Sequence, residues 1–255
     1  MLSRIAAAVV PACGTLTVTA DPGARPARGS ILVANHTSLA DPAVVVAALR
    51  RYGIEPVILA TSGLWRVPLL GSALRREGHI AVHRGTHRAA DSLDAAAVAL
   101  ASGRSVLLYG EGRLPGRRDA GESAPGPFRS GLARLAAATG APVVPVGQAG
   151  ARRLCSGSRA KQLAGALTSP LRRPRLHVHI GSPLHLTDRV PESTERAREA
   201  VTTAWRTAAL SLGELAAPGQ SRRGGGALQR GVTSSSASCA PGPRGPRPPR
   251  RRPCR

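Results

Sequence analysis

The sequence predicts an α/β protein in which a central mixed, largely parallel sheet is flanked by helices, followed by a disordered C-terminal tail. Two observations support this fold class. Short β-branched runs alternate with longer segments rich in Ala, Leu and Arg, and beyond Leu215 the composition changes to Gly, Pro, Ser and Arg. The chain has 255 residues, enough to bury a core of useful size, and only 2% of them are aromatic. The core must therefore consist mainly of Ala, Val and Leu.

The β-branched runs are typical of strands, and the longer Ala-rich and Leu-rich segments are typical of helices. The predicted strands are, in order, Thr15–Thr19, Ile31–Ala34, Val57–Ala60, Ile80–His83, Val106–Tyr109, Val143–Val146 and Leu176–Ile180. The predicted helices are Pro42–Tyr52, Ala89–Ala101, Ser130–Thr139 and Pro191–Leu212. The last of these resembles a closing amphipathic helix, because Ala200, Ala204 and Ala208 recur every four residues.

The composition also predicts a boundary between a folded domain at 1–217 and a disordered tail at 218–255. The tail contains nine arginines and no acidic residue, and it is too poor in apolar residues to fold. The whole chain has a net charge of +22, and residues 1–217 alone keep +13. Such an excess predicts attraction to an anionic partner, whether lipid headgroups, a phosphorylated substrate or nucleic acid.

Neither a disulfide framework nor a metal site is expected, because Cys13, Cys155, Cys239 and Cys254 form no C-x-x-C pair and no zinc spacing. A reducing cytoplasm fits this pattern. The apolar run Ile5–Val10 is followed by Pro11 and falls well short of the about 20 residues that span a bilayer. A signal peptide stays open as an alternative for this segment. Any membrane contact should be peripheral, and we expect it at the cytoplasmic face of the plasma membrane.

A candidate catalytic pair lies where the strand Ile31–Ala34 ends. His36 falls at the carboxyl end of this strand, and Asp41 falls in the first turn of the next helix. In α/β folds, sites form at the carboxyl ends of strands. A turn there can fold the Asp41 carboxylate back onto the imidazole, which fixes the tautomer of His36 and makes it a competent general base. The alternative is that Asn35 and Asp41 are ordinary turn and cap residues and that His36 is a surface loop histidine.

Four blocks of residues occur in order, each at the predicted end of a strand. They are Asn35-His36-Thr37-Ser38-Leu39-Ala40-Asp41, Gly78-His79-Ile80-Ala81-Val82-His83-Arg84, Tyr109-Gly110-Glu111-Gly112-Arg113 and Val143-Val144-Pro145-Val146. Together they resemble the N-H-x4-D, G-x-I-x-x-x-R, F-P-E-G-T-R and V-P-V blocks of the glycerolipid acyltransferases, the family typified by 1-acyl-sn-glycerol-3-phosphate acyltransferase. The resemblance extends from about residue 15 to about residue 185.

The resemblance implies a role for each matching residue. His36 is expected to take the proton from the acceptor hydroxyl as it attacks a thioester, and Asp41 is expected to orient the imidazole. Arg84 is expected to bind the acceptor phosphate, because a guanidinium presents a planar fork of donors. Glu111 and Gly112 are expected to shape the acceptor pocket. The full set of expected substrate-binding residues is Asn35, Arg84, Glu111, Gly112 and Arg113.

The implied reaction moves a fatty acyl group from acyl-CoA or acyl carrier protein to the free hydroxyl of 1-acyl-glycerol-3-phosphate and yields phosphatidic acid. It implies no cofactor and no metal. The expected partners are the thioester donor, a lysophospholipid acceptor and an anionic membrane surface, without a specific nucleic acid.

The third block departs from the family pattern. Gly110 stands where the family has proline, Arg113 stands in place of threonine, and Leu114 stands in place of arginine. Either Arg113 supplies the missing charge, or the acceptor carries no phosphate at that place. The second possibility keeps another lysolipid, such as a lyso-ornithine lipid, as an alternative acceptor.

A nucleic-acid-binding protein is the rival from a different class, suggested by the charge and the Arg-rich tail. With one Phe, two Trp and two Tyr, the chain has too few aromatic rings for a base-stacking platform.

Two histidine patterns lie outside the blocks' proposed chemistry. His79, His83 and His87 are spaced by four, but strand-like residues intervene, so a metal site is not expected there. His177 and His179 alternate on a predicted strand, and we expect them on a solvated face of it.

Overall fold

A computed structural model describes residues 1–85, 89–114 and 121–213. Its sheet has seven strands in the order β1-β7-β6-β2-β5-β3-β4. In chain order the strands are β1 (Thr15–Ala20), β2 (Ile31–Ala34), β3 (Val57–Thr61), β4 (Ile80–Val82), β5 (Val106–Tyr109), β6 (Val143–Ala149) and β7 (Arg175–Ile180). All seven predicted strands are confirmed. The tail expected at 218–255, and its boundary with the folded domain, lie outside the described residues.

Neighbouring strands in the middle of the sheet run parallel, so their carboxyl ends share one edge. β2 pairs in parallel with β5 and β6, and β3 pairs in parallel with β5 and β4. At the other side, β7 is antiparallel to β6, while β1 is parallel to β7. The sheet is therefore mixed and largely parallel, as predicted. The segments that follow β2, β4 and β5 all lie at the shared edge.

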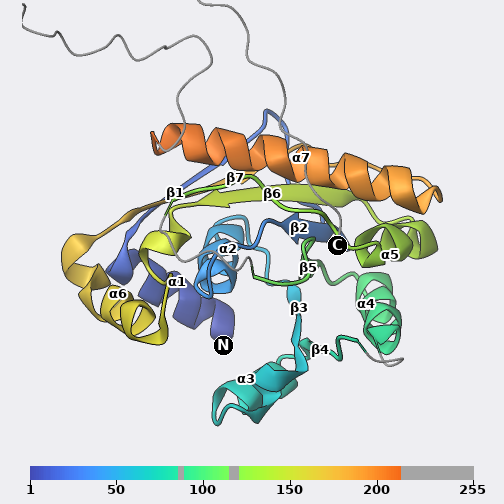
Figure 1. Ribbon diagram of the computed structural model, residues 1–255. Coiled ribbons are helices and arrows are strands. Elements are labelled where there is room, and N and C mark those ends of the chain that lie inside the picture. The colour runs from blue at the N-terminus through green and yellow to red at the C-terminus, as the bar shows by residue number, and fades with distance from the viewer. Residues whose placement is uncertain (86–88, 115–120, 214–255) are drawn as a thin grey trace, which may run out of the picture. The chain divides into compact units, whose positions relative to one another are not determined.

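Helices cover both faces of the sheet (Figure 1). They are α1 (Leu2–Cys13), α2 (Asp41–Arg50), α3 (Leu70–Arg76), α4 (Asp91–Ala101), α5 (Gly131–Thr139), α6 (Arg159–Arg172) and α7 (Val190–Ser211), with short 3-10 turns η1 (Ser62–Arg66) and η3 (Ala151–Arg153). The four predicted helices are confirmed as α2, α4, α5 and α7, whereas α1, α3 and α6 were not predicted. Among the described residues, no helix combines the length and apolar character that a bilayer crossing needs.

The strand β2 is buried on both faces, which places the segment that follows it at the centre of the shared edge. On one face, Leu32 and Ala34 pack in a core with residues of α1 and α2. On the other face, Ile31 and Val33 pack with residues of α4, α5 and α7. Because helices cover both sides, all four β2 residues are apolar rather than alternating with polar ones.

The long helix α7 lies directly on β6 (Figure 1). A side chain at Gly147 of β6 would put its Cβ 2.0 Å from the backbone carbon of Ala204 in α7. Only glycine permits this approach, which also buries Trp205 and Ala208.

The expectation of a solvated face for His177 and His179 is wrong. Both imidazoles are buried on β7. Their ring nitrogens find hydrogen-bond partners on β1 and in the residue that follows it. Thr19 Oγ1 lies 2.8 Å from His177 Nε2 and 2.9 Å from His179 Nδ1. The other nitrogen of His179 lies 3.0 Å from Asp21 Oδ1. The physical reason is that α7 packs against β7, so this face of the sheet is covered.

Candidate active site

The turn between β2 and α2 brings His36 and Asp41 together. His36 Nδ1 lies 2.9 Å from Asp41 Oδ2. Asp41 is fully buried at the start of α2, and the His36 side chain keeps 13% of its surface exposed. The amino end of a helix stabilises a negative charge, so Asp41 stands where a buried carboxylate costs least. The structure thus forms the pair that strand-end reasoning predicted.

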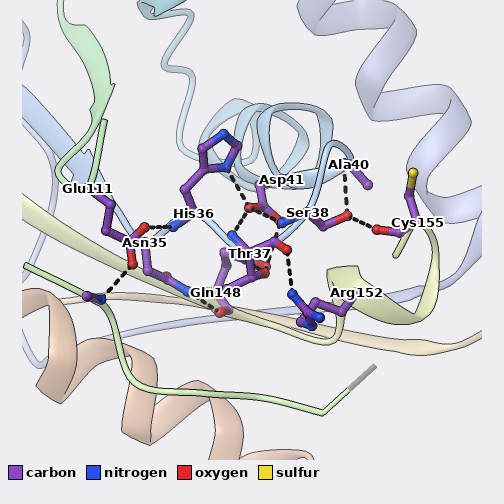
Figure 2. Close-up of polar contacts among 11 residues, drawn as sticks. Asn35, His36, Thr37, Ser38, Ala40, Asp41, Glu111, Gln148, Arg152 and Cys155 are labelled. Atoms are coloured by element: carbon purple, nitrogen blue, oxygen red, sulfur yellow. Dashed lines mark hydrogen bonds and ion pairs between the residues drawn. The ribbon is translucent and has the colours of Figure 1, made fainter. Parts of the chain in front are cut away.

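Other groups of the same turn hold the Asp41 carboxylate in place (Figure 2). Oδ2 accepts hydrogen bonds from the backbone N–H of Ser38, at 2.8 Å, and of Thr37. The Thr37 hydroxyl donates to Oδ1 at 3.4 Å. A carboxylate bonded in this way cannot rotate away from the imidazole, so the orientation of His36 is fixed before any substrate binds.

The pairing decides which nitrogen of His36 can act as a base. Because the ionised Asp41 carboxylate only accepts, the bonded Nδ1 carries the proton and Nε2 keeps its lone pair. No described residue hydrogen-bonds Nε2. The imidazole therefore presents a free basic nitrogen at the edge of the sheet, held from behind by a carboxylate.

The ring of Tyr109, the last residue of β5, stacks on the His36 imidazole. The ring centroids lie 4.3 Å apart, with 28° between the planes. The Tyr109 hydroxyl is buried and has no hydrogen-bond partner among the described residues. Burial, with a smaller contribution from the charge of Asp41, raises the pKa of this hydroxyl well above its usual value. Tyr109 therefore stays neutral and limits the movement of His36 by packing.

Glu111 holds the backbone of the histidine. Its Oε2 accepts from the N–H of His36 at 2.7 Å, and its Oε1 accepts from the N–H of Gly126 at 2.9 Å (Figure 2). Burial raises the pKa of Glu111, and the two backbone donors oppose that rise. These contacts give Glu111 a positioning role that the sequence did not suggest. Its expected part in the acceptor pocket stays a prediction.

One departure of the third block, the glycine at position 110, has a local structural reason. A side chain at Gly110 would put its Cβ 2.3 Å from the ring of Phe128, so that ring occupies the space of the family's proline. Gly112 has φ +69°, in the left-handed region that favours glycine. The backbone turn that directs Glu111 back to His36 thus depends on Gly112.

A second layer of polar contacts, made by β6, supports the turn between β2 and α2. Asn35 and Gln148 exchange two hydrogen bonds: Asn35 Nδ2 donates to the Gln148 carbonyl at 3.0 Å, and the Gln148 N–H donates to Asn35 Oδ1 at 2.8 Å. Gln148 Nε2 also donates to Thr37 Oγ1 at 3.0 Å. Both polar ends of the Asn35 amide are thus bonded to the chain, and its predicted contact with substrate stays a prediction.

Arg152 is a site residue that the sequence did not reveal. It is buried, and its Nη1 donates to the Thr37 carbonyl at 2.9 Å. In the sequence it stands beside Arg153 and resembles any surface arginine. A buried guanidinium below the turn completes a set of contacts that leaves the backbone between His36 and Asp41 little freedom.

The two arginines expected to bind phosphate lie at the shared edge but outside this set of contacts. Arg84 follows β4, and Arg113 follows the turn after β5. Both side chains are exposed. No hydrogen bond or ion pair links either guanidinium to His36 or Asp41 in the described part of the chain. The structure thus brings together His36, Asp41, Asn35 and Glu111, and leaves Arg84 and Arg113 free for a ligand.

Within residues 1–85, 89–114 and 121–213, no group of three His, Cys, Asp or Glu side chains is placed to hold a metal ion. His79 instead accepts the Ile58 N–H at 3.0 Å through Nδ1. His87, the last of the histidines spaced by four, lies outside the described residues.

An α/β sheet whose N-H-x4-D turn holds a carboxylate-bound histidine is the arrangement that the four sequence blocks predicted. Residues 16–148 match the sequence profile of the Acyltransferase family, more than half of the chain, and the chain belongs to that family. This confirms the resemblance drawn from the four blocks. No curated protein sequence gives a significant match.

Among solved structures, the fold is similar to that of the 1-acyl-sn-glycerophosphate (LPA) acyltransferase PlsC from Thermotoga maritima. The TM-score is 0.60 at 18% sequence identity, over 82% of this chain and 79% of that one. At such low identity the likeness supports the fold.

Proposed function

We propose that the protein transfers a fatty acyl group from acyl-CoA or acyl carrier protein to the free hydroxyl of 1-acyl-glycerol-3-phosphate, giving phosphatidic acid. The observation that supports this most strongly is the His36 imidazole, bonded to buried Asp41 through Nδ1 and free at Nε2. The family match supports acyl transfer. The activity named for the structural relative supports the acceptor.

In this reaction His36 Nε2 takes the proton of the acceptor hydroxyl while that oxygen forms a bond to the thioester carbonyl carbon. The tetrahedral intermediate then collapses, the carbon–sulfur bond breaks, and the leaving thiolate takes the proton back from Nε2. Asp41 stabilises the imidazolium between these two transfers. A positioned base of this kind typically contributes about a hundredfold to ten-thousandfold to the rate.

The side chains near His36 favour direct transfer without a covalent acyl-enzyme. The Ser38 hydroxyl is buried and donates to the Cys155 carbonyl at 2.5 Å, so it is not poised on the imidazole. Burial, followed by the charge of Asp41, raises the pKa of the Cys155 thiol. A thiol with a raised pKa is a poor nucleophile at neutral pH.

The acceptor's phosphate is assigned to Arg84 and Arg113. Both guanidiniums are exposed at the edge that carries His36, and an anion with several oxygens suits their forked donors. A second acceptor class, a lysolipid without this phosphate, is favoured by one observation: Leu114 replaces the family's arginine.

The experiment that tests the proposal is an acyl-transfer assay of the purified full chain with a panel of acceptors and both thioester donors. Lysophosphatidic acid should give the highest kcat/KM. A higher kcat/KM on a phosphate-free lysolipid would move the assignment to the second class. Thioester hydrolysis without transfer to any lysolipid would overturn acyl transfer to lipids.

The proposed setting is an anionic membrane surface at the cytoplasmic face of the plasma membrane, supported by the net charge of +22. Each arginine near such a surface contributes on the order of 1 kcal/mol. Removing residues 218–255 should therefore weaken binding to anionic vesicles, measured by sedimentation at low and at high salt, and leave turnover of micellar substrate nearly unchanged. Equal vesicle binding by both chains at every salt concentration would show that the tail takes no part.

A further inference from the structure

The helix α6 exposes its large apolar side chains. Leu163, Leu167 and Leu171 lie four residues apart, so they share one side of the helix. They are 63%, 71% and 89% exposed. Single exposed leucines are ordinary on protein surfaces, but three in a row on one helix form a continuous apolar stripe.

The opposite side of α6, which packs on the protein, carries small and polar residues. Ser169 is its buried residue, and Gln162 and Gly165 are half-buried. A side chain at Gly165 would put its Cβ 2.7 Å from the Leu154 carbonyl oxygen, so the helix packs closely there. Arg172 also links the helix to the segment before it, because its Nη2 donates to the carbonyl of Arg153 at 3.2 Å. The leucines are thus not needed to hold α6 on the domain.

The neighbouring helix α1 also exposes large apolar side chains, although its inward side is partly apolar as well. Its inward side carries Ser3, Ala6 and Val10, whereas Ile5 and Val9 are 47% and 50% exposed. The two helices pack side by side on the face of the sheet opposite α7 (Figure 1). We call the exposed side chains of Ile5, Val9, Leu163, Leu167 and Leu171 the α1–α6 face.

The two helices of the α1–α6 face carry basic residues and no acidic ones, and the nearest described carboxylates, Glu55 and Glu77, contact the first turn of α1. The sequence of α6 contains Arg159, Lys161 and Arg172 without an acid, and α1 contains Arg4 without an acid. No acidic residue occurs between Glu122 and Asp188. An apolar stripe flanked by basic residues is the pattern of helices that lie in the interface of an anionic bilayer.

The start of α6 is joined to the active-site turn. The Ser38 hydroxyl of that turn donates to the carbonyl of Cys155, four residues before α6 begins. Leu39, between His36 and Asp41, is 59% exposed. A surface that contacted α6 would therefore lie beside the turn that carries the base.

We infer that the α1–α6 face docks the protein on an anionic lipid bilayer, with the leucines inserted between headgroups and acyl chains. The inference adds to the proposed function by naming the surface that contacts the membrane. The purpose of this contact rests on the proposed function, whereas the binding itself does not. Leucines that project from the outer side of a helix suit a fluid layer that closes around them. An acidic carrier protein, the other partner that this charge would attract, would have to offer a matching groove.

The test is binding of the full chain to vesicles of phosphatidylcholine with phosphatidylglycerol, measured by sedimentation without any turnover. Leu167→Ser is compared with Val98→Ser, because both side chains are 71% exposed and Val98 lies on α4, away from the α1–α6 face. Leu167→Ser should weaken binding about threefold, and the triple Leu163→Ser, Leu167→Ser, Leu171→Ser variant about tenfold or more. Val98→Ser should change binding less than about twofold.

A fluorescence measurement keeps the inference testable if the triple variant folds poorly. In a Trp65→Phe and Trp205→Phe background, Leu167→Trp should shift its emission to the blue when vesicles are added, and Val98→Trp should not. Unchanged vesicle binding by the triple variant, or equal shifts of both tryptophans, would overturn the bilayer assignment. So would unchanged vesicle binding combined with a raised KM for acyl carrier protein alone, since the face would then dock a protein. Failure of the acyltransferase assay would leave these binding results unaffected.

Discussion

The turn that carries His36 and the surface that carries Arg84 and Arg113 lie along the same edge of the sheet but differ in how they are held. In the turn, the imidazole, the Asp41 carboxylate and the backbone between them are bonded to the chain itself, through Glu111 and Arg152 among others. The two arginines are exposed and are held by no described residue.

Under the proposed function, this difference separates the residues that carry out the chemical step from the residues that recognise the acceptor. A base acts best when its geometry is fixed before the substrate arrives, so the cost of ordering it is met during folding. A group that recognises an anion can gain its hydrogen bonds from the ligand, and until then it is better solvated than buried. Substitutions in the turn should therefore lower kcat for every acceptor, whereas substitutions of the arginines should act on one kind of acceptor.

The largest effect expected within this comparison comes from Asp41→Asn. An asparagine is neutral, so it would no longer stabilise the imidazolium that forms when Nε2 takes the proton of the acceptor. We expect kcat to fall roughly a thousandfold to ten-thousandfold with every acceptor, by analogy with the same change in a serine protease triad. Steady-state kinetics on a variant whose circular dichroism matches the wild type would check this. A loss below tenfold would show that the charge of Asp41 does not support the base.

A smaller and more selective effect is expected from Arg84→Ala and Arg113→Ala. Each removes a charge-assisted contact worth about 1.5–3 kcal/mol, or about ten- to a hundredfold in kcat/KM. The loss should occur with lysophosphatidic acid and not with a lysolipid of equal chain length that lacks the phosphate. Equal losses on both acceptors would show that the arginines act on the site in general and do not recognise the phosphate. No loss on either acceptor would show that they do not belong to the site.

The smallest effect is expected at Tyr109, which contacts the turn only by packing. Tyr109→Phe should change kcat less than about twofold, because the hydroxyl has no partner among the described residues. Tyr109→Leu removes the stacked ring and should lower kcat about fivefold, which corresponds to the about 1 kcal/mol of an aromatic contact. If Tyr109→Phe were the more damaging change, the hydroxyl would have to contact substrate. Kinetics on several acceptors would then show which acceptor it contacts.

Sequence reasoning found the elements with strong local signals. Strands made of Val, Ile and Leu, and the helix at 190–211 with its alanines four apart, are specified by periodicity alone. The helix α6 was missed because its interior contains Gly165 and Pro170 and its leucines point outward, against the usual pattern. The sequence predicts solvent exposure for His177 and His179 because no local signal shows that α7 covers that face of the sheet.

The residues of the candidate site also divide into those that local sequence signals predict and those that they do not. His36 and Asp41 are neighbours in the sequence, so a turn at a strand end suffices to predict their contact. Gln148 and Arg152 reach the turn from more than a hundred residues away, at 3.0 and 2.9 Å from Thr37. No spacing rule connects such distant positions. The Phe128 ring that fills the place of a proline at Gly110 was equally hidden, since it depends on the path of a loop.

The most direct test of the account is the acyl-transfer rate of His36→Ala, measured with lysophosphatidic acid and with a phosphate-free lysolipid after the variant's fold has been checked. We expect kcat to fall by at least about a hundredfold with both acceptors, while KM changes little, because the base takes part in the chemical step and not in binding. Wild-type turnover by the folded variant with either acceptor would contradict the assignment of His36 as the base.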